Sequence, residues 1–213
     1  MASPQDDYIV FPDETNQSPE TIPPLAVSTQ HENAENSSLS YNAVPGAASP
    51  SSFKNLDLGY FSDHPLNTLE DHTALMEMCL KENNPEAHYI EGLKEYFHFG
   101  NTAKGLFHLR SSADGDYANA TYMYGLLMLS RGNLKEGKRY MATLGWRDNK
   151  QQVDRCWRRI RRSLRHFDIS MKKRYVRNML LLKPSKRCHV NDLDTRCKRC
   201  FRYKQVLKFI DFI

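Results

Sequence analysis

The amino-acid sequence predicts an all-α protein, in which stacked helical repeats follow a disordered acidic N-terminal tail. Three observations support this fold class. Apolar residues recur with helical spacing from about residue 66 onward, similar segments reappear about 33 residues apart, and residues 1–50 show no apolar periodicity. The net charge changes with these features, from −7 in residues 1–50 to −3 in residues 51–145 and +15 in residues 146–213. Three such compositions indicate segments with different physical roles.

Residues 1–50 are expected to form the disordered tail. This segment contains seven of the ten prolines and seven acidic residues, but no lysine or arginine. Its apolar residues are too sparse to compensate for the conformational entropy that folding removes. We therefore place the first helices from about residue 66 onward, with residues 51–65 as a linker before the repeats.

The first helix of the repeat region is expected over residues 68–82. Thr68 and Asp71 are three residues apart ahead of an apolar run, which fits a capping box at the helix N-terminus. Pro85 ends the helix, because proline disfavours helical geometry in the residue before it. The same proline suits the first turn of the next helix.

Two copies of one helix-turn-helix pattern are expected within residues 66–145. Alanine, tyrosine and glycine occur in the same order in both copies, 33 residues apart in each case. The small residues allow two helix backbones to approach closely, and the tyrosines fill the space beside them. These candidate repeat-packing residues are Ala87, Tyr89, Gly92, Ala120, Tyr122 and Gly125. An ordinary helical bundle with chance similarity is the alternative interpretation.

Residues 146–184 are expected to form basic amphipathic helices that cap the stack, because two repeats cannot bury their own faces. Over residues 148–167 apolar side chains fall on one stripe of a helix, and arginines occupy most other positions. The stripe consists of Val153, Cys156, Trp157, Ile160, Leu164 and Phe167. Residues 171–182 repeat this design. The side chains expected inside that second helix are Tyr175, Val176, Met179 and Leu180.

The basic face of residues 148–167 has three interpretations. It is a solvated or self-associating surface, a surface for an acidic protein or for nuclear import, or a nucleic-acid surface. Nucleic acid ranks last, because no recognised nucleic-acid module is present and no aromatic residues are interleaved with the arginines for base stacking. The candidate partner-binding arginines are Arg158, Arg159, Arg161 and Arg162.

Residues 185–213 form a cysteine-containing C-terminal segment. Cys197 and Cys200 make a Cys-x-x-Cys pair, and Cys188 precedes it by nine residues. Such a pair supplies two thiolates at the angle that tetrahedral zinc requires, so zinc is the one cofactor that the sequence suggests. Free thiols that pack a terminal hairpin or helix, and redox chemistry, are the alternatives. The apolar residues after Cys200 are expected to fold back onto the basic helices.

The repeat residues resemble a known group of proteins. The pattern Ala-x-Tyr-x-x-Gly, followed by a Gly-Leu-x-x-Leu helix, is similar to the Sel1-like branch of the tetratricopeptide superfamily. More narrowly, residues 84–144 resemble the helical repeats of a plant family of F-box-related proteins, in which an F-box precedes the repeats and a short cysteine cluster follows them. The resemblance implies a TPR-like fold, and it covers roughly residues 51–60 and 68–213.

The F-box part of this resemblance is small. Residues 51–56 resemble an internal fragment of the F-box, and the Leu-Pro start and the helices that should follow are missing. The F-box is the part that would hold Skp1 in a cullin-type ubiquitin ligase. Residues 51–65 are therefore interpreted as a remnant of an F-box-like segment, and Skp1 is not an expected partner.

The function that these features favour is non-catalytic protein–protein interaction on the helical-repeat surface. Phosphate-binding loops, hydrolase nucleophile motifs and dinucleotide-binding motifs are missing, which argues against an enzyme. No apolar run is long enough to span a membrane, and the scattered cysteines suit an intracellular protein of the nucleus, the cytoplasm or both. The alternatives are a substrate-recruiting ligase subunit and a nucleic-acid-associated protein. On the repeat helices, the candidate partner-binding residues, expected to be exposed, are Glu91, Lys94, Glu95 and Tyr124.

Overall fold

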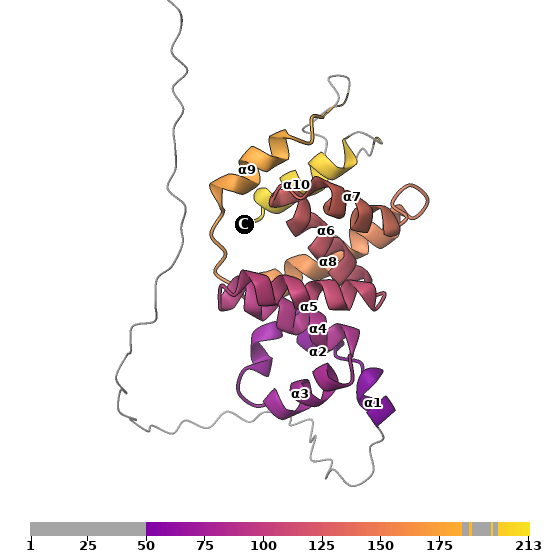
Figure 1. Cartoon of the computed structure of the whole chain (residues 1–213), viewed down its shortest axis with the longest axis vertical. Helices are drawn as coiled ribbons and strands as arrows, with labels where there is room; N and C mark the ends of the chain where they lie inside the picture. The colour runs from indigo at the N-terminus through magenta and orange to yellow at the C-terminus, as the bar shows by residue number, and fades with distance from the viewer. Residues whose placement is uncertain (1–49, 185–187, 189–196, 198–199) are drawn as a thin grey trace, which may run out of the picture. The chain divides into compact units, whose positions relative to one another are not determined.

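The computed structural model describes residues 50–184, Cys188, Cys197 and residues 200–213, and every regular element in this part of the chain is helical (Figure 1). The prediction of an all-α protein is confirmed for these residues. Residues 1–49, which cover almost all of the predicted disordered tail, lie outside them. The α-helices are α1 (Pro50–Lys54), α2 (Gly59–Asp63), α3 (Thr73–Lys81), α4 (Pro85–Leu93), α5 (Thr102–Asp114), α6 (Ala118–Ser130), α7 (Leu134–Thr143), α8 (Lys150–Leu164), α9 (Lys173–Leu180) and α10 (Phe201–Ile210).

Two short turns of other helical types complete the chain path. A 3₁₀ turn, η1 (Pro65–Thr68), separates α2 from α3, and a π-helical turn, η2 (Lys94–His98), continues α4. Helix α3 begins at Thr73, so the capping box predicted at Thr68 and Asp71 is wrong. The Thr68 hydroxyl instead donates a hydrogen bond to the carbonyl oxygen of Pro65, 2.8 Å away, which closes the 3₁₀ turn.

Asn84 defines the start of the first repeat. Its side-chain oxygen accepts hydrogen bonds from the backbone N–H groups of Glu86 (2.9 Å) and Ala87 (3.2 Å), which is the N-cap arrangement for α4. Its amide nitrogen donates to the carbonyl oxygens of Phe53 (2.8 Å) and Leu56 (2.9 Å). One buried side chain therefore begins α4 and also holds the end of α1 and the residues after it against α4.

Helices α4 and α5 form the first helical hairpin of the stack. A Cβ atom placed on Gly92 would lie 2.7 Å from Cγ and 2.9 Å from the backbone nitrogen of Leu109. Conversely, a Cβ atom placed on Gly105 of α5 would lie 2.7 Å from the backbone nitrogen of Tyr96. Each helix thus contributes one glycine at which the other helix approaches too closely for any side chain.

Helices α6 and α7 repeat this arrangement in the second hairpin. Gly125 faces Met141, as Gly92 faces Leu109 in the first hairpin. Gly137 faces Leu129, as Gly105 faces Tyr96. These four contact residues follow their counterparts by 33, 32, 32 and 33 positions, respectively. The repeat is therefore reproduced in the pairwise contacts of the helices as well as in the sequence.

Helix α6 lies at the centre of the fold (Figure 1). All of its residues except Ala118 are buried, and it packs against α5, α7, α8, α9 and α10. A helix that is apolar on all sides requires neighbours on all sides. The helices after the second repeat, α8, α9 and α10, supply part of these neighbours.

The three C-terminal helices bury most of the faces that their patterns indicate, and Val176 of α9 is half-buried. The stripe of α8 is buried apart from the half-buried Trp157, and Phe201, Val206 and Phe209 of α10 are fully buried. In α9, however, Leu180 is 61% exposed, so its predicted inner position is wrong. Asn178 lies inside instead, because its amide donates to the carbonyl oxygen of Ser130 at the end of α6 (3.0 Å).

Within the described residues, every helix is too short or too polar to serve as a membrane span.

Candidate protein-binding surface

The polar residues predicted to be exposed on the repeat helices are largely buried. The exposed fractions are 6% for Lys94, 4% for Glu95 and 4% for Tyr124, and Glu91 is half-buried. The expectation that these side chains are exposed is therefore wrong. Tyr124 is buried because other helices cover α6 on every side. The sequence pattern of an open repeat stack does not indicate this burial.

Three of these side chains form an ion-pair network inside the first hairpin. Lys94 Nζ lies 2.8 Å from a carboxylate oxygen of Glu91, and Lys104 Nζ lies 2.6 Å from one of Glu95. Burial alone raises the pKa of Glu95, but hydrogen bonds from Lys104 and Asn101 hold that pKa below its ordinary value. The network joins α4, η2 and α5, so these charged side chains have a structural role.

Tyr124 makes the equivalent connection in the second hairpin. Its hydroxyl donates to a carboxylate oxygen of Glu136 at 2.8 Å. Tyr124 and Glu136 follow Glu91 and Lys104 by 33 and 32 residues. A hydrogen bond from a phenol to a carboxylate therefore replaces an ion pair at the same place in the repeat. Burial raises the pKa of Tyr124, and the phenol therefore stays neutral and remains a donor.

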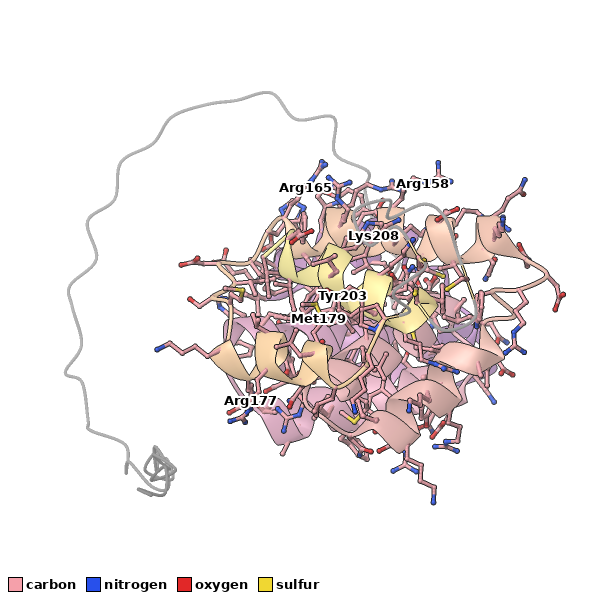
Figure 2. All side chains as sticks on the ribbon, turned by 90° about the horizontal axis from the view of Figure 1, so that it is seen from above. Arg158, Arg165, Arg177, Met179, Tyr203 and Lys208 are labelled. Atoms are coloured by element: carbon pink, nitrogen blue, oxygen red, sulfur yellow. The ribbon has the colours of Figure 1, made fainter. Side chains whose placement is uncertain are left out.

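Exposed arginines gather on α8. We use the name arginine face for six exposed side chains of this helix: Arg155, Arg158, Arg159, Arg161, Arg162 and Arg165. Figure 2 shows Arg158 and Arg165 on the outer side of α8, with Lys208 of α10 next to that helix. Four of the six are the arginines that the sequence proposed for partner binding, and the structure brings them together on one surface.

Helix α8 is fixed firmly to the rest of the fold. The Asn149 side chain accepts a hydrogen bond from the backbone N–H of Gln152 and caps the helix start (3.0 Å). Near the other end, the Ser163 hydroxyl donates to the carbonyl oxygen of Ser62 (2.6 Å), and Arg162 pairs with Asp63 (2.8 Å). Because both ends are held, the remaining arginines project from a rigid element.

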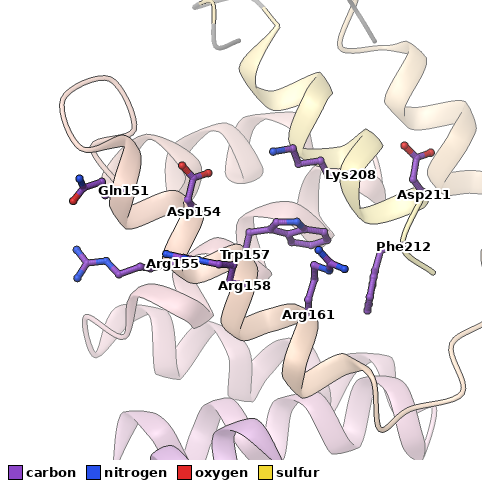
Figure 3. Close-up of a pocket in the computed structure, with 9 residues that line it drawn as sticks. All are labelled: Gln151, Asp154, Arg155, Trp157, Arg158, Arg161, Lys208, Asp211 and Phe212. Carbon is purple, nitrogen blue, oxygen red and sulfur yellow. The ribbon is translucent and has the colours of Figure 1, made fainter. Parts of the chain in front are cut away.

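Beside the arginine face, a cleft of about 880 Å³ opens between α8 and the C-terminal end of α10 (Figure 3). Its apolar part consists of Trp157 and Phe212, whose rings meet edge to face with centroids 5.8 Å apart. The guanidinium of Arg161 lies 5.4 Å from the centre of the Phe212 ring, a cation–π contact. The charged residues around the rings are Asp154, Arg155, Arg158, Arg161, Lys208 and Asp211.

This cleft corrects one inference from the sequence. No aromatic residue was expected among the arginines, yet Trp157 is only half-buried and lines the cleft together with Phe212. The two residues are 55 positions apart in the chain, so no local pattern indicates that they meet.

Most of the arginine face is available for an outside partner. Among the described residues, Arg158, Arg159 and Arg165 form no ion pair, whereas Arg162 pairs with Asp63. The only cysteine on α8, Cys156, is buried, and this burial raises its pKa to about 11, so it contributes no negative charge to the surface. The face is therefore a concentrated and largely uncompensated positive surface.

The other predicted site residues lie elsewhere. The six repeat-packing residues are all buried, and Gly92 and Gly125 lie where the two helices of each hairpin cross. The hydroxyls of Tyr89 and Tyr122 instead reach Ser163 of α8 and Gln205 of α10. The sulfur atoms of Cys188, Cys197 and Cys200 lie together at the N-terminal end of α10.

The fold and its repeated glycine contacts define a helical-repeat protein. Residues 61–165 match the sequence profile described as plant tetratrico peptide repeats. The prediction of a TPR-like repeat region is thereby confirmed. No solved structure matches the chain.

A similar protein is known in Arabidopsis thaliana, where it is named F-box protein At2g35280. The two sequences are 41% identical over 93 residues, which is 44% of this chain and 56% of that protein. The predicted relationship to plant F-box-related proteins is confirmed by this match. The chain thus spans little more than half of the relative's length.

Proposed function

We propose that this protein is a non-catalytic interaction module that binds an acidic segment of a partner protein on the arginine face. The observation that carries the proposal is the cleft in which Trp157 and Phe212 stand among arginines. Arginine and tryptophan are the residues that most often dominate the energy of protein–protein interfaces. A partner with carboxylates around an apolar or aromatic anchor fits both the charge and the apolar part of this cleft.

The arrangement of charges favours a protein partner over nucleic acid. Asp154 and Asp211 stand within the same cleft as the arginines. These carboxylates interrupt the positive surface that a continuous phosphate backbone requires, whereas the separate charges of a peptide can match a surface of mixed sign. The plant repeat region also supports this choice, because stacked helical repeats commonly recognise peptides and domains. As an interaction module with reduced thiols, the protein is proposed to reside in the nucleus, the cytoplasm or both.

A second candidate function is a substrate-recruiting subunit of a cullin-type ubiquitin ligase. The similarity to an Arabidopsis F-box protein favours it. In the described part of the chain, however, the helices before α3 are only four or five residues long. Short helices are marginal unless they are packed on a larger surface, and α1 and α2 already pack on α3 and α4. We therefore expect binding to Skp1 to be weak or absent, which a direct binding measurement with purified Skp1 tests.

The experiment for the main proposal compares two triple variants of the full chain. The first replaces Arg155, Arg158 and Arg161 by glutamine, which keeps helix propensity and spares the Arg162 ion pair. The matched control replaces three exposed lysines on α3 and α7 by glutamine. These are Lys81, Lys135 and Lys138. The probe is a fluorescein-labelled peptide rich in glutamate with a central phenylalanine, followed by fluorescence anisotropy at several salt concentrations.

We expect the wild type and the control to bind this peptide with an affinity that falls as salt rises. The arginine variant should bind at least about tenfold more weakly, since exposed ion pairs contribute up to about 1 kcal/mol each. A single-stranded DNA of equal charge serves as the competitor. DNA binding that is tighter than peptide binding, and that is lost in the arginine variant, contradicts the proposal and favours the nucleic-acid alternative.

A further inference from the structure

Three of the five cysteines converge at one place in the fold. The Sγ atoms of Cys188, Cys197 and Cys200 all lie within 4.8 Å of one another, and none of these residues forms a disulfide. Cys200 is fully buried, and the other two are half-buried. Zinc–thiolate bonds of about 2.3 Å in a tetrahedron separate sulfur atoms by roughly 3.8 Å, so small side-chain rotations suffice to bind one ion.

The backbone around the Cys-x-x-Cys pair is arranged to favour thiolates. The N–H of Cys200 donates to Sγ of Cys197 at 3.1 Å, and the N–H of Phe201 donates to the carbonyl oxygen of Cys197 at 3.0 Å. A hydrogen bond to sulfur stabilises the charged form of the thiol. Cys200 also stands at the N-cap of α10, where the helix dipole favours negative charge.

The surrounding sequence supplies the positive charge that a zinc–thiolate centre requires. One zinc ion with three thiolates carries a net charge of −1. Residues 186–208 contain eight lysines and arginines but only two acidic residues. Within α10 itself, Nε of Arg202 is buried without a hydrogen-bond partner. A buried cationic group is favoured by negative charge nearby, and an anionic centre at the start of this helix supplies such charge.

The other two cysteines lack these features. Cys79 and Cys156 are buried in the apolar core, and burial raises the pKa of both thiols. Neither belongs to the cluster of converging sulfur atoms. They remain thiols at neutral pH and provide matched controls within the same chain.

We propose that Cys188, Cys197 and Cys200 form a structural zinc site, with a fourth ligand that comes from outside this group of three. The ion connects Cys188, which follows α9, to Cys200, the residue directly before α10. It thereby holds α10 in place, including Phe201, whose ring stacks on Trp146 with centroids 4.2 Å apart. Because α10 also carries Lys208, the site supports one side of the candidate binding cleft.

The test uses the full chain, purified under reducing conditions without added chelator. We expect about one equivalent of zinc by mass spectrometry of the metal, and a thiolate-to-cobalt absorption band when Co²⁺ replaces it. Cys188→Ser and Cys197→Ser should each weaken Co²⁺ binding by more than the 10- to 100-fold that second-shell changes typically cost. Cys79→Ser and Cys156→Ser should bind Co²⁺ as the wild type does.

Two outcomes overturn the proposal. The first is a reduced wild-type chain that is purified without zinc and gives no thiolate–cobalt band on titration. The second is a native disulfide between two of the three cysteines, found by mass spectrometry without reduction, which assigns redox chemistry to the cluster. Because both are measured on the wild type, a variant that fails to fold does not obscure the answer. Loss of peptide binding in the arginine variants leaves this result unaffected.

Discussion

The hydroxyl oxygens of Tyr96 and Tyr175 lie 2.7 Å apart, although the two residues are 79 positions apart in the chain. Both side chains are buried, one in η2 of the first repeat and the other in α9. Burial raises the pKa of Tyr175, and its hydroxyl shares one hydrogen bond with that of Tyr96. This bond connects the first hairpin directly to the C-terminal helices and shows how two repeats are stabilised by elements outside the repeat.

A double-mutant cycle measures this connection. Tyr96→Phe and Tyr175→Phe each leave one buried hydroxyl without its partner, so each should lower the free energy of unfolding by about 1 kcal/mol or more. The double variant should cost less than the sum of the two, because it removes both hydroxyls. Urea denaturation followed by circular dichroism gives the values. Additive costs would show that the two hydroxyls do not interact.

Much of the fold is predictable because its information is local. The arginine and apolar positions of α8 alternate with helical period, and they predict both the buried stripe and the exposed face. The 33-residue recurrence likewise predicts the two hairpins, since Gly92 and Gly125 lie at equivalent crossings. These features depend on residues that are close together in the chain or repeated in it.

The candidate site is less predictable because its contacts are not local. Tyr124 appears accessible in a two-repeat pattern, but five helices surround α6 and bury it. Leu180 fits the apolar stripe of α9, yet Asn178 takes the inner position to reach a carbonyl oxygen of α6. The contact of Trp157 with Phe212 depends on the return of the chain terminus to α8, which no spacing in the sequence specifies.

The two repeat glycines should differ in how much an added methyl group costs. At Gly92 a Cβ atom would lie 2.9 Å from the backbone nitrogen of Leu109, which cannot move easily. At Gly125 the closest atom is Cγ of the flexible Met141 side chain, 3.0 Å away, and the nearest backbone atom, the Met141 nitrogen, is 3.2 Å away. Overpacking costs about 1–3 kcal/mol, against a gain of about 1 kcal/mol in helix propensity.

We therefore expect Gly92→Ala to destabilise the protein clearly and Gly125→Ala to change its stability little. The larger Gly125→Val should destabilise more than any exposed substitution. Thermal and urea unfolding of the three variants provide the comparison. An equal or greater loss for Gly125→Ala than for Gly92→Ala would mean that Met141 is held as rigidly as the backbone of Leu109.

Asn84 allows its two roles to be separated by substitution. Asn84→Asp keeps the oxygen that caps α4 but places a carboxylate against the carbonyl oxygens of Phe53 and Leu56, whereas Asn84→Ser keeps a cap without the repulsion. We expect Asn84→Asp to release the segment around α1 while α4 stays helical. Hydrogen exchange measured by mass spectrometry should show this as faster exchange before residue 60. Unchanged exchange there in Asn84→Asp would show that the two carbonyl contacts do not hold the segment.

His88 and His108 should make the stability of the first hairpin depend on pH. Their Nδ1 atoms lie 2.9 Å apart, so one ring must donate to a neutral partner. Burial lowers the pKa of both rings, and charge on His108 lowers the pKa of His88 further. The unfolded chain, with an ordinary histidine pKa of about 6.5, therefore binds more protons than the folded chain below that pH. It follows that stability is complete above about pH 6.5 and is lost as the pH falls toward the folded-state values.

The measurement is the free energy of unfolding in urea between about pH 7.5 and about pH 5. We expect the wild type to lose stability over this range, and His108→Asn to lose less of it, because the amide replaces Nδ1 without titrating. The slope of the unfolding free energy with pH is the relevant quantity, since His108→Asn also changes stability at neutral pH. His98→Asn removes an exposed histidine in the adjacent η2 and should keep the wild-type slope. Equal slopes for wild type and His108→Asn would show that the paired rings do not control the acid sensitivity of the fold.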